Sequence, residues 1–577
     1  MLNRLSERQV SFALALYGLG LVAWLLVAQA PVTQEDGFYY FKIAQNVAQG
    51  AGSTFDGLHV TNGYHPLWLW CLVPVFWLTS SPVTALQLGT ILQGILMATS
   101  AGLLYSTARL RFGRPAASLA ALLWVMWLYR VSLGGVEFSL HALGLIASAY
   151  VYLRWFSGEG PPSPAAYFGL GCLLSLTFLA RLDTLPLAGV IGLFLIRREF
   201  RLQTGEGSHK RPVPRLRRSS GIAGRAGSRE TSPVHGSGDQ GTEGGSRIST
   251  PSLKRWLAFG LPVLTIGLAY LGSNLWQFGL PFPVSGLIKL DWSRYLLAQD
   301  PVYRSQGWWA AKAHAVWWPV SHLRPLQTFY LMLGSVGISG LRLMGAGSDW
   351  LHRTLQPWDP FILFSVLNLL GYIWLYHGDL SFTIWYYVMQ PWLVVMLVAA
   401  LFDDLIQRWR SAPGSSQWGS LTCRAGRLGL AILWCSVPLA TLRGLEQWVH
   451  RERLGLDPEP LRDAAQWARV NLPDDAVIGA WNAGAIGYLS ERRVVNLDGV
   501  VNSGTYYQTE RYDLCRYWQS SGINYLVDVF ENQQALSVAP TYPAYARCAD
   551  HLELVWADHD YGPAWYVAVY RIIPLGG

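Results

Sequence analysis

The sequence predicts a membrane protein made mainly of helices, with about eleven transmembrane helices and a small C-terminal α/β domain. Hydrophobic residues make up 51% of the 577 residues and charged residues only 14%, whereas soluble proteins carry about 25% charged residues. The 28 Trp and 28 Tyr residues fit a chain with many membrane–water boundaries, where amphipathic rings settle. This composition excludes a wholly soluble enzyme, a disordered protein and a small disulfide-rich scaffold.

The first apolar run, Val10 to Ala30, is long enough to cross a hydrocarbon core of about 30 Å. Arg4 and Arg8 precede it, so the positive-inside rule places the N-terminus in the cytoplasm. The run is too long for a signal peptide and lacks a small-residue cleavage site. Residues 31–82 are therefore expected to form the first external loop, with juxtamembrane helices.

Within that loop, Leu67 to Thr79 is apolar but short and is flanked and interrupted by prolines, which predicts an interfacial or re-entrant helix. The next span, Thr84 to Ala108, then delivers three arginines to the cytoplasm, as the charge rule requires. Further spans are expected near 116–133, 137–154, 166–182, 184–196, 256–276, 325–344, 359–376, 382–402 and 427–445. Residues 1–445 would then form the transmembrane module, and the chain would leave it on the external side.

The net charge of +8 is concentrated in one segment. Residues 197–255 contain thirteen Lys or Arg and five Asp or Glu, so this segment alone accounts for the excess. Within it, residues 203–252 are rich in Gly, Ser, Arg and Pro without an apolar period, which predicts a disordered basic cytoplasmic loop rather than a nucleic-acid site. Residues 277–324 are expected to form the middle external loop.

From about residue 446 to 577 the hydropathy falls, and short β-rich runs such as 493–497 and 565–570 alternate with helical patterns such as 461–471. We therefore expect a small extracytoplasmic α/β domain over residues 446–577. It contains Cys515 and Cys548, which the extracytoplasmic location would allow to form a disulfide.

The densest group of candidate functional residues lies just after the first span. Glu35 and Asp36 are adjacent there and are followed by an aromatic run and by Lys42. A carboxylate at this place suits a general base acting on an acceptor hydroxyl, or the pair could hold a divalent metal ion. The alternative is that both acids only cap a juxtamembrane helix.

The motif from Glu35 to Asn46, followed by Thr54-Phe55-Asp56-Gly57 and by the segment from Thr61 to Trp68, resembles the first loop of GT-C superfamily glycosyltransferases. The resemblance is closest to bacterial relatives of the protein O-mannosyltransferase and aminoarabinose transferase group. It implies a GT-C type all-α membrane fold with an acidic first external loop. It also implies a sugar donor carried on polyprenyl phosphate.

Shorter segments resemble motifs of the same superfamily. They are Gly135-Val136-Glu137-Phe138, the segment from Leu179 to Asp183, the segment from Gly279 to Ser285 with Lys289, and the segment from Trp385 to Pro391. The Trp-Trp-Asp-Tyr-Gly signature of the oligosaccharyltransferase branch is absent from the sequence, which disfavours transfer of a preassembled oligosaccharide.

These motifs give the candidate site residues. Asp36 is the proposed base, with Glu35 as the alternative, and either would be a ligand if a metal ion takes part. The residues expected to bind the donor phosphate or lipid are Lys42, His65, Lys289 and Arg294; for Lys42 and Lys289, snorkelling to lipid headgroups is an equal alternative. The residues expected to support substrate binding are Tyr40, Asn62, Tyr64, Glu137, Asp183 and Tyr387, although pairing with Arg181 would equally explain Asp183.

The resulting hypothesis is an inverting membrane glycosyltransferase that moves a sugar from polyprenyl phosphate to an extracytoplasmic glycan, lipid or protein. No cofactor is assigned apart from the possible divalent metal ion, and no nucleic-acid partner is expected. The alternatives are a transporter or flippase, and a non-enzymatic envelope-glycan assembly protein. A transporter would be expected to show repeats and charged, unwound segments in mid-span, and neither is evident in the sequence.

Overall fold

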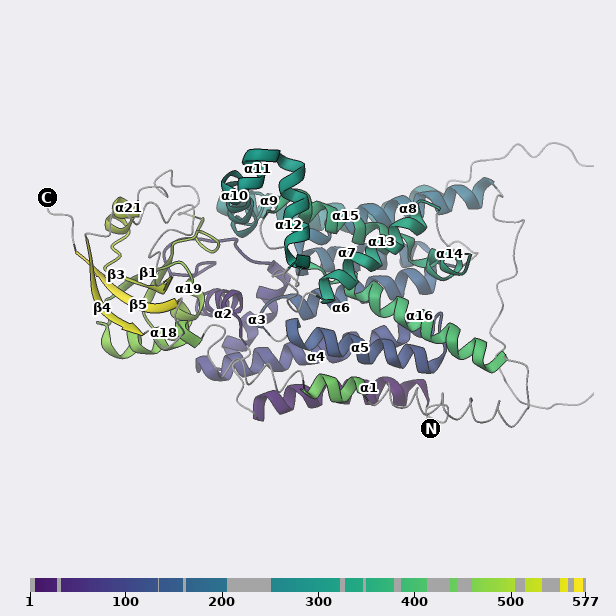
Figure 1. The fold of residues 1–577 in the computed structure, drawn as a ribbon, viewed down its shortest axis with the longest axis horizontal. Coiled ribbons are helices and arrows are strands. Elements are labelled where there is room, and N and C mark those ends of the chain that lie inside the picture. Colours follow the sequence, from purple (N-terminus) through teal and green to yellow (C-terminus); the bar gives the residue numbers. More distant parts are fainter. Residues whose placement is uncertain are drawn as a thin grey trace, which may run out of the picture.

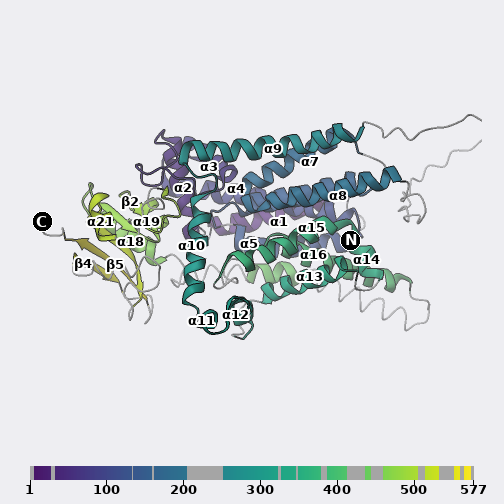
Figure 2. The same ribbon diagram turned by 90° about the horizontal axis from the view of Figure 1, so that it is seen from above.

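The computed structural model is mostly helical, with one small sheet near the C-terminus (Figures 1 and 2). The structure describes residues 6–27, 33–132, 134–158, 162–204, 251–321, 327–345, 349–377, 386–411, 436–443, 459–503, 514–531, 551–558 and 565–573. The predicted basic loop, the last expected span and Cys548 fall largely or wholly outside these ranges.

The helices of the first part of the chain are α1 (Glu7–Val27), α2 (Glu35–Ala48), α3 (Pro66–Leu78), α4 (Pro82–Arg109), α5 (Arg114–Ser132), α6 (Phe138–Val151), α7 (Pro164–Ala180) and α8 (Leu185–Thr204), with the short turns η2 (Tyr152–Phe156) and η3 (Leu182–Thr184). The chain continues through α9 (Pro251–Phe278), α10 (Val284–Gln299), α11 (Pro301–Gln306), α12 (Trp308–Ser321), α13 (Gln327–Leu343), α14 (Asp349–Leu355), η4 (Gln356–Trp358), α15 (Asp359–Leu375) and α16 (Met389–Ser411).

Each expected span from Val10 to residue 402 coincides with a helix. The last of these, α16, begins at Met389 rather than near 382, and Pro391 lies in its first turn, where a missing N–H is tolerated. Among the described residues, four helices have the length and hydropathy of a membrane span, and three more are apolar but shorter. These helices indicate an integral membrane protein, while the number of about eleven spans and the orientation in the membrane stay predictions.

Close helix crossings hold the bundle together. A Cβ atom on Gly94 of α4 would lie 2.3 Å from a methyl carbon of Val22 in α1, and one on Gly171 of α7 would lie 2.4 Å from the backbone oxygen of Phe259 in α9. Small residues at such crossings let helix backbones approach in a bilayer, where packing replaces the hydrophobic effect as the driving force.

The C-terminal α/β region comprises α18 (Glu459–Asn471), β1 (Val477–Ala480), α19 (Ala483–Leu489), β2 (Arg493–Asn496), α21 (Leu514–Ser520), β3 (Tyr525–Glu531), β4 (Leu552–Asp558) and β5 (Trp565–Ile572). Its five strands have the order β2-β1-β3-β5-β4. Strand β1 runs parallel to β2 and β3, whereas β5 runs antiparallel to β3 and β4.

The sheet lies at one end of the long axis of the molecule, and the long helices of the bundle extend away from it (Figure 1). Helices α2 and α3 lie between the two parts, and α10 crosses the end of the bundle that faces the sheet (Figure 2). The predicted acidic loop is thus located where the bundle meets the C-terminal α/β region.

Candidate functional site

Helix α2 presents its two adjacent carboxylates to different surroundings. Consecutive helical residues are about 100° apart around the axis, so Glu35 and Asp36 cannot share one face. One turn later, Tyr39 follows Glu35 on the side of the C-terminal α/β region, and Tyr40 follows Asp36 on the side of the bundle. The acidic pair is therefore divided between an interface and a polar network.

Asp36 is accessible and lies beside a lysine. Its side chain is 48% exposed, and its Oδ2 is 3.9 Å from Nζ of Lys289, which comes from α10. The same Nζ donates a hydrogen bond of 3.0 Å to the hydroxyl of Tyr386. A partly exposed carboxylate on α2 thus lies next to the ammonium group of a lysine on α10, and Tyr386 holds that ammonium group in position.

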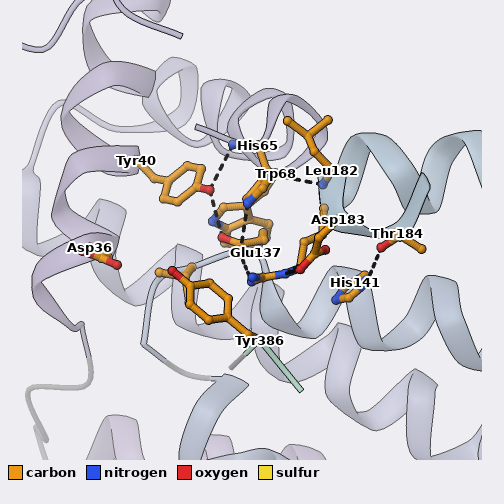
Figure 3. A network of polar contacts seen from close by, with 12 residues as sticks. Asp36, Tyr40, His65, Trp68, Glu137, His141, Leu182, Asp183, Thr184 and Tyr386 are labelled. Atoms are coloured by element: carbon orange, nitrogen blue, oxygen red, sulfur yellow. Dashed lines mark hydrogen bonds and ion pairs between the residues drawn. The ribbon is translucent and has the colours of Figure 1, made fainter. Parts of the chain in front are cut away.

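Behind Tyr386, a buried ion network joins the ends of two helices (Figure 3). Arg181, at the end of α7, is 2% exposed and donates to Glu137 at 2.7 Å and to Asp183 at 2.9 Å. The Tyr386 ring lies over its guanidinium group, 4.6 Å from the ring centroid. Because Arg181 is buried and already paired with two carboxylates, the network is suited to holding the neighbouring side chains in place.

Tyr40 and His65 extend this network towards α2 and α3. The Tyr40 hydroxyl donates to Glu137 Oε2 at 2.9 Å and accepts from the backbone N–H of His65 at 3.1 Å (Figure 3). The His65 ring accepts from the backbone N–H of Leu182 at Nδ1, and its Nε2 lies 3.6 Å from Glu137. His65 thus carries its proton on Nε2, towards Glu137.

The turn that carries Glu137 fits closely against the start of α2. Gly135 has a φ of +84°, which favours glycine. Trp68 and Gln93 fix this turn by donating hydrogen bonds to the backbone oxygens of Gly135 and Val136. A Cβ atom on Gly37 would lie 2.3 Å from the backbone oxygen of Gly134. The distance between α2 and this turn therefore depends on Gly37.

Replacing Gly37 by Ala is expected to destabilise the protein by about 1–3 kcal/mol, because the methyl group would force α2 away from residue 134. The measurement is the thermal unfolding midpoint of the purified protein. Gly20→Ala is the matched control, since a Cβ at this helical position meets nothing within 4 Å. Equal midpoints for the two variants would contradict the close fit.

Glu35 lies in the interface with the C-terminal α/β region. Its two carboxylate oxygens accept hydrogen bonds from the backbone N–H groups of Gly484 and Ala485, at the start of α19. Burial raises the pKa of Glu35 to about 8 in spite of these donors. Next to it, the Tyr39 hydroxyl accepts from the backbone N–H of Ala483 at 3.2 Å.

Two of the predicted phosphate-binding residues lie away from Asp36. Lys42 is on the Glu35 side of α2, where it interacts with the charge of Glu491, and burial lowers its pKa. Arg294 is five residues beyond Lys289 on α10, its side chain is 76% exposed, and it pairs with Asp291 at 3.2 Å. The structure therefore brings Lys289 and His65 to the network but not Lys42 or Arg294.

Three other predicted residues have structural partners. Asn62 receives a hydrogen bond from the backbone N–H of Val284 at 2.9 Å and donates to the backbone oxygen of Phe282 at 3.1 Å, which fixes the turn before α10. The Tyr64 hydroxyl is 2.7 Å from that of Ser53. Tyr387 is buried, with its ring 5.6 Å from the ring of Tyr372.

Sequence reasoning did not select Arg181 and Tyr386 as site residues. The sequence indicates Arg181 only as a partner of Asp183, and the observed ion pair agrees with that alternative. Tyr386 is the neighbour of the selected Tyr387 in one aromatic run, and nothing in the sequence distinguishes the two. His141, whose Nε2 is 2.7 Å from the hydroxyl of Thr184, was also missed (Figure 3).

Over the described ranges, no three His, Cys, Asp or Glu side chains gather in a way that could hold a metal ion. The arrangement around Asp36 can support proton transfer and anion binding. An exposed carboxylate can accept a proton from an approaching hydroxyl, and the adjacent ammonium group can stabilise a phosphate.

Comparisons with known proteins agree with a GT-C fold. A family model described as "Domain of unknown function (DUF8728)" matches residues 447–570. No curated protein matches the chain. The crystal structure of ArnT from Cupriavidus metallidurans in the apo state has 13% identity and a TM-score of 0.50, over 96% of this chain and 97% of that chain.

Two further crystal structures are also similar. ArnT from Cupriavidus metallidurans bound to undecaprenyl phosphate has 11% identity and a TM-score of 0.49, over 98% of this chain and 97% of that chain. The apo oligosaccharyltransferase of Archaeoglobus fulgidus has 12% identity and a TM-score of 0.48, over 90% of this chain and 69% of that chain. The likeness to apo ArnT confirms the resemblance to GT-C glycosyltransferases at the level of the fold.

Proposed function

We propose that this chain, which has the GT-C fold, is a membrane glycosyltransferase that moves a sugar from a polyprenyl-phosphate donor to an extracytoplasmic acceptor. The observation that carries the proposal is the contact between the exposed carboxylate of Asp36 and the ammonium group of Lys289. The ArnT protein that shares the fold has been crystallised with undecaprenyl phosphate, which makes the same class of donor a reasonable expectation here.

In the proposed reaction, Asp36 accepts the proton of an acceptor hydroxyl or amine while the acceptor atom attacks the anomeric carbon of the sugar. The bond from this carbon to the phosphate oxygen breaks, and the polyprenyl phosphate leaves with the bonding electrons. Lys289 stabilises the negative charge that develops on the phosphate. One in-line displacement of this kind inverts the configuration at the anomeric carbon.

The split of the acidic pair favours Asp36 over Glu35 as the base. Both oxygens of Glu35 are engaged by backbone N–H groups of α19, so its role is better explained by attachment of the C-terminal α/β region. Asp36 has an exposed side chain and a cation beside it. The Arg181 network acts behind them by holding Tyr386 and Tyr40.

The binding of undecaprenyl phosphate tests the donor assignment. Lys289→Gln is expected to weaken binding about ten-fold or more, because a hydrogen bond to a charged group contributes about 1.5–3 kcal/mol. The measurement is native mass spectrometry of the purified protein titrated with this lipid. Arg294→Gln is the control on the same helix and is expected to bind as the unaltered protein does. Equal binding by both variants would contradict the assignment of Lys289.

The transfer itself is tested by mass comparison of glycolipids and glycoproteins from cells with and without the gene. A sugar-containing product that requires the chain, and that is lost with Asp36→Asn while the protein remains folded, is expected. A transporter or an assembly protein would keep its function in this variant. If the product survives in Asp36→Asn cells, the proposed function is wrong.

A further inference from the structure

The carboxyl ends of the parallel strands of the C-terminal sheet face helices α2 and α10. After β1 the chain enters α19, whose first residues contact Glu35 and Tyr39 of α2. After β2 it passes through Asp498 and Gly499, and a Cβ atom on Gly499 would lie 3.2 Å from Cδ1 of Ile288 in α10. The two helices that carry Asp36 and Lys289 therefore both contact this edge of the sheet.

The order of the strands also marks this edge of the sheet as a position where ligands bind in related sheets. The chain moves from β1 to β2 on one side and then to β3 on the other side of β1, so the direction of winding reverses at β1. In open α/β sheets, ligands bind outside the carboxyl ends of the strands at such a reversal. In this protein, α2 and α10 contact the chain at that place.

Asp498 is the acidic residue that β2 delivers to this place. Its Oδ1 accepts a hydrogen bond of 2.8 Å from the backbone N–H of Val500, which fixes the direction of the side chain. The next residue, Gly499, lies against Ile288, which directly precedes Lys289, and Asp498 is coupled electrostatically to both Asp36 and Lys289. Burial, with a contribution from Asp36, raises the pKa of Asp498 to about 7.

The balance of charge around Asp36 restricts the acceptor. Lys289 is the cation that contacts Asp36, and in the proposed reaction it serves the donor phosphate. Among the described residues, Asp498 is an acidic side chain that interacts with both of them. At a pH above about 7, where Asp498 is ionised, a second anion brought in by the acceptor would meet two carboxylates, whereas a neutral hydroxyl group can donate a hydrogen bond to either of them.

We infer that Asp498 of the C-terminal α/β region completes the active site by accepting a hydrogen bond from a neutral, hydroxyl-bearing acceptor and positioning it against Asp36. The inference rests on the proposed function and assigns the acceptor side of the same site. In this arrangement Asp498 contacts the acceptor but does not take its proton. The proton of the acceptor hydroxyl goes to Asp36. The C-terminal α/β region would thereby select neutral acceptors over anionic ones.

The test compares Asp498→Asn with Asp36→Asn in cells that lack the chromosomal gene. Two quantities are measured: the amount of the gene-dependent glycosylated product by mass spectrometry, and the binding of undecaprenyl phosphate to the purified variants. Asp498→Asn is expected to lower the product about ten-fold or more, as for loss of a hydrogen bond to a charged group. Its binding of undecaprenyl phosphate is expected to stay within about two-fold of the unaltered protein, because the acceptor side does not hold the donor.

Two further variants separate function from folding. Glu553→Gln removes an exposed carboxylate from β4, in the same region, and is expected to leave the product unchanged. Asp498→Glu keeps the charge and is expected to recover part of the product that Asp498→Asn loses. The product from the unaltered protein should carry the added sugar on a neutral hydroxyl, in either the glycolipid or the protein fraction.

Full product in Asp498→Asn cells, combined with loss in Asp36→Asn cells, would overturn this inference and leave the proposed function intact. Weakened binding of undecaprenyl phosphate by Asp498→Asn would also overturn it, as would a sugar attached to an anionic group of the acceptor. Full product in Asp36→Asn cells would overturn the proposed function and this inference with it.

Discussion

Replacing Asp36 by Asn is expected to lower the rate of sugar transfer by about 10²–10⁴-fold, the range that a general base contributes. Asparagine has nearly the same shape but cannot accept the proton of the acceptor in the transition state. Because Asp36 is exposed and contacts Lys289 at 3.9 Å, its replacement should leave folding unchanged. The measurement is product formation in proteoliposomes, with the thermal unfolding midpoint determined on the same preparation.

Glu35→Gln is the informative comparison for this experiment. Glu35 accepts from two backbone N–H groups of α19, so its replacement is expected to loosen the C-terminal α/β region and lower the unfolding midpoint. A stable Glu35→Gln protein without activity, together with an active Asp36→Asn protein, would reverse the assignment of the base.

Replacing Arg181 by Met is expected to give the largest loss of stability. Arg181 is 2% exposed and is the partner of both Glu137 and Asp183, so its removal leaves two carboxylates in a buried network without their cation. Removing one partner of a buried ion pair costs about 3–5 kcal/mol. A lowered unfolding midpoint and a loss of transfer are both expected, since Tyr386 and Tyr40 depend on the network.

The control for this experiment is an ion pair at the surface. Arg469 and Glu491 are 2.8 Å apart, and each is about half exposed. Arg469→Met should therefore change stability by no more than about 1 kcal/mol. A similar, small effect of Arg181→Met would contradict the view that the Glu137–Arg181–Asp183 network holds the site.

The segments that meet at the candidate site each carry a local motif, although the sequence did not indicate that they come together. Glu137, Asp183 and Lys289 were selected from short segments, and the structure brings all three into one connected network with Asp36. Helix positions were also predictable, since apolar runs of this length are directly visible in a sequence.

The partners of individual side chains were less predictable. Glu35 contacts residues 449 and 450 positions away in the chain, and no local pattern encodes such a contact. The separation of Lys289 from Arg294 follows from helical geometry, because five residues correspond to a rotation of about 140°. This rotation applies because residues 284–299 form a helix, whereas the sequence indicates only an external loop there.

A structure of the protein with undecaprenyl phosphate in a lipid nanodisc would test the assignment of Asp36 and Lys289 directly. The lipid phosphate is expected within hydrogen-bonding distance of Lys289 Nζ, with the carboxylate of Asp36 facing the side from which an acceptor enters. A phosphate bound at the end of the bundle remote from the C-terminal sheet, with Lys289 and Asp36 both out of contact, would contradict the assignment of this site.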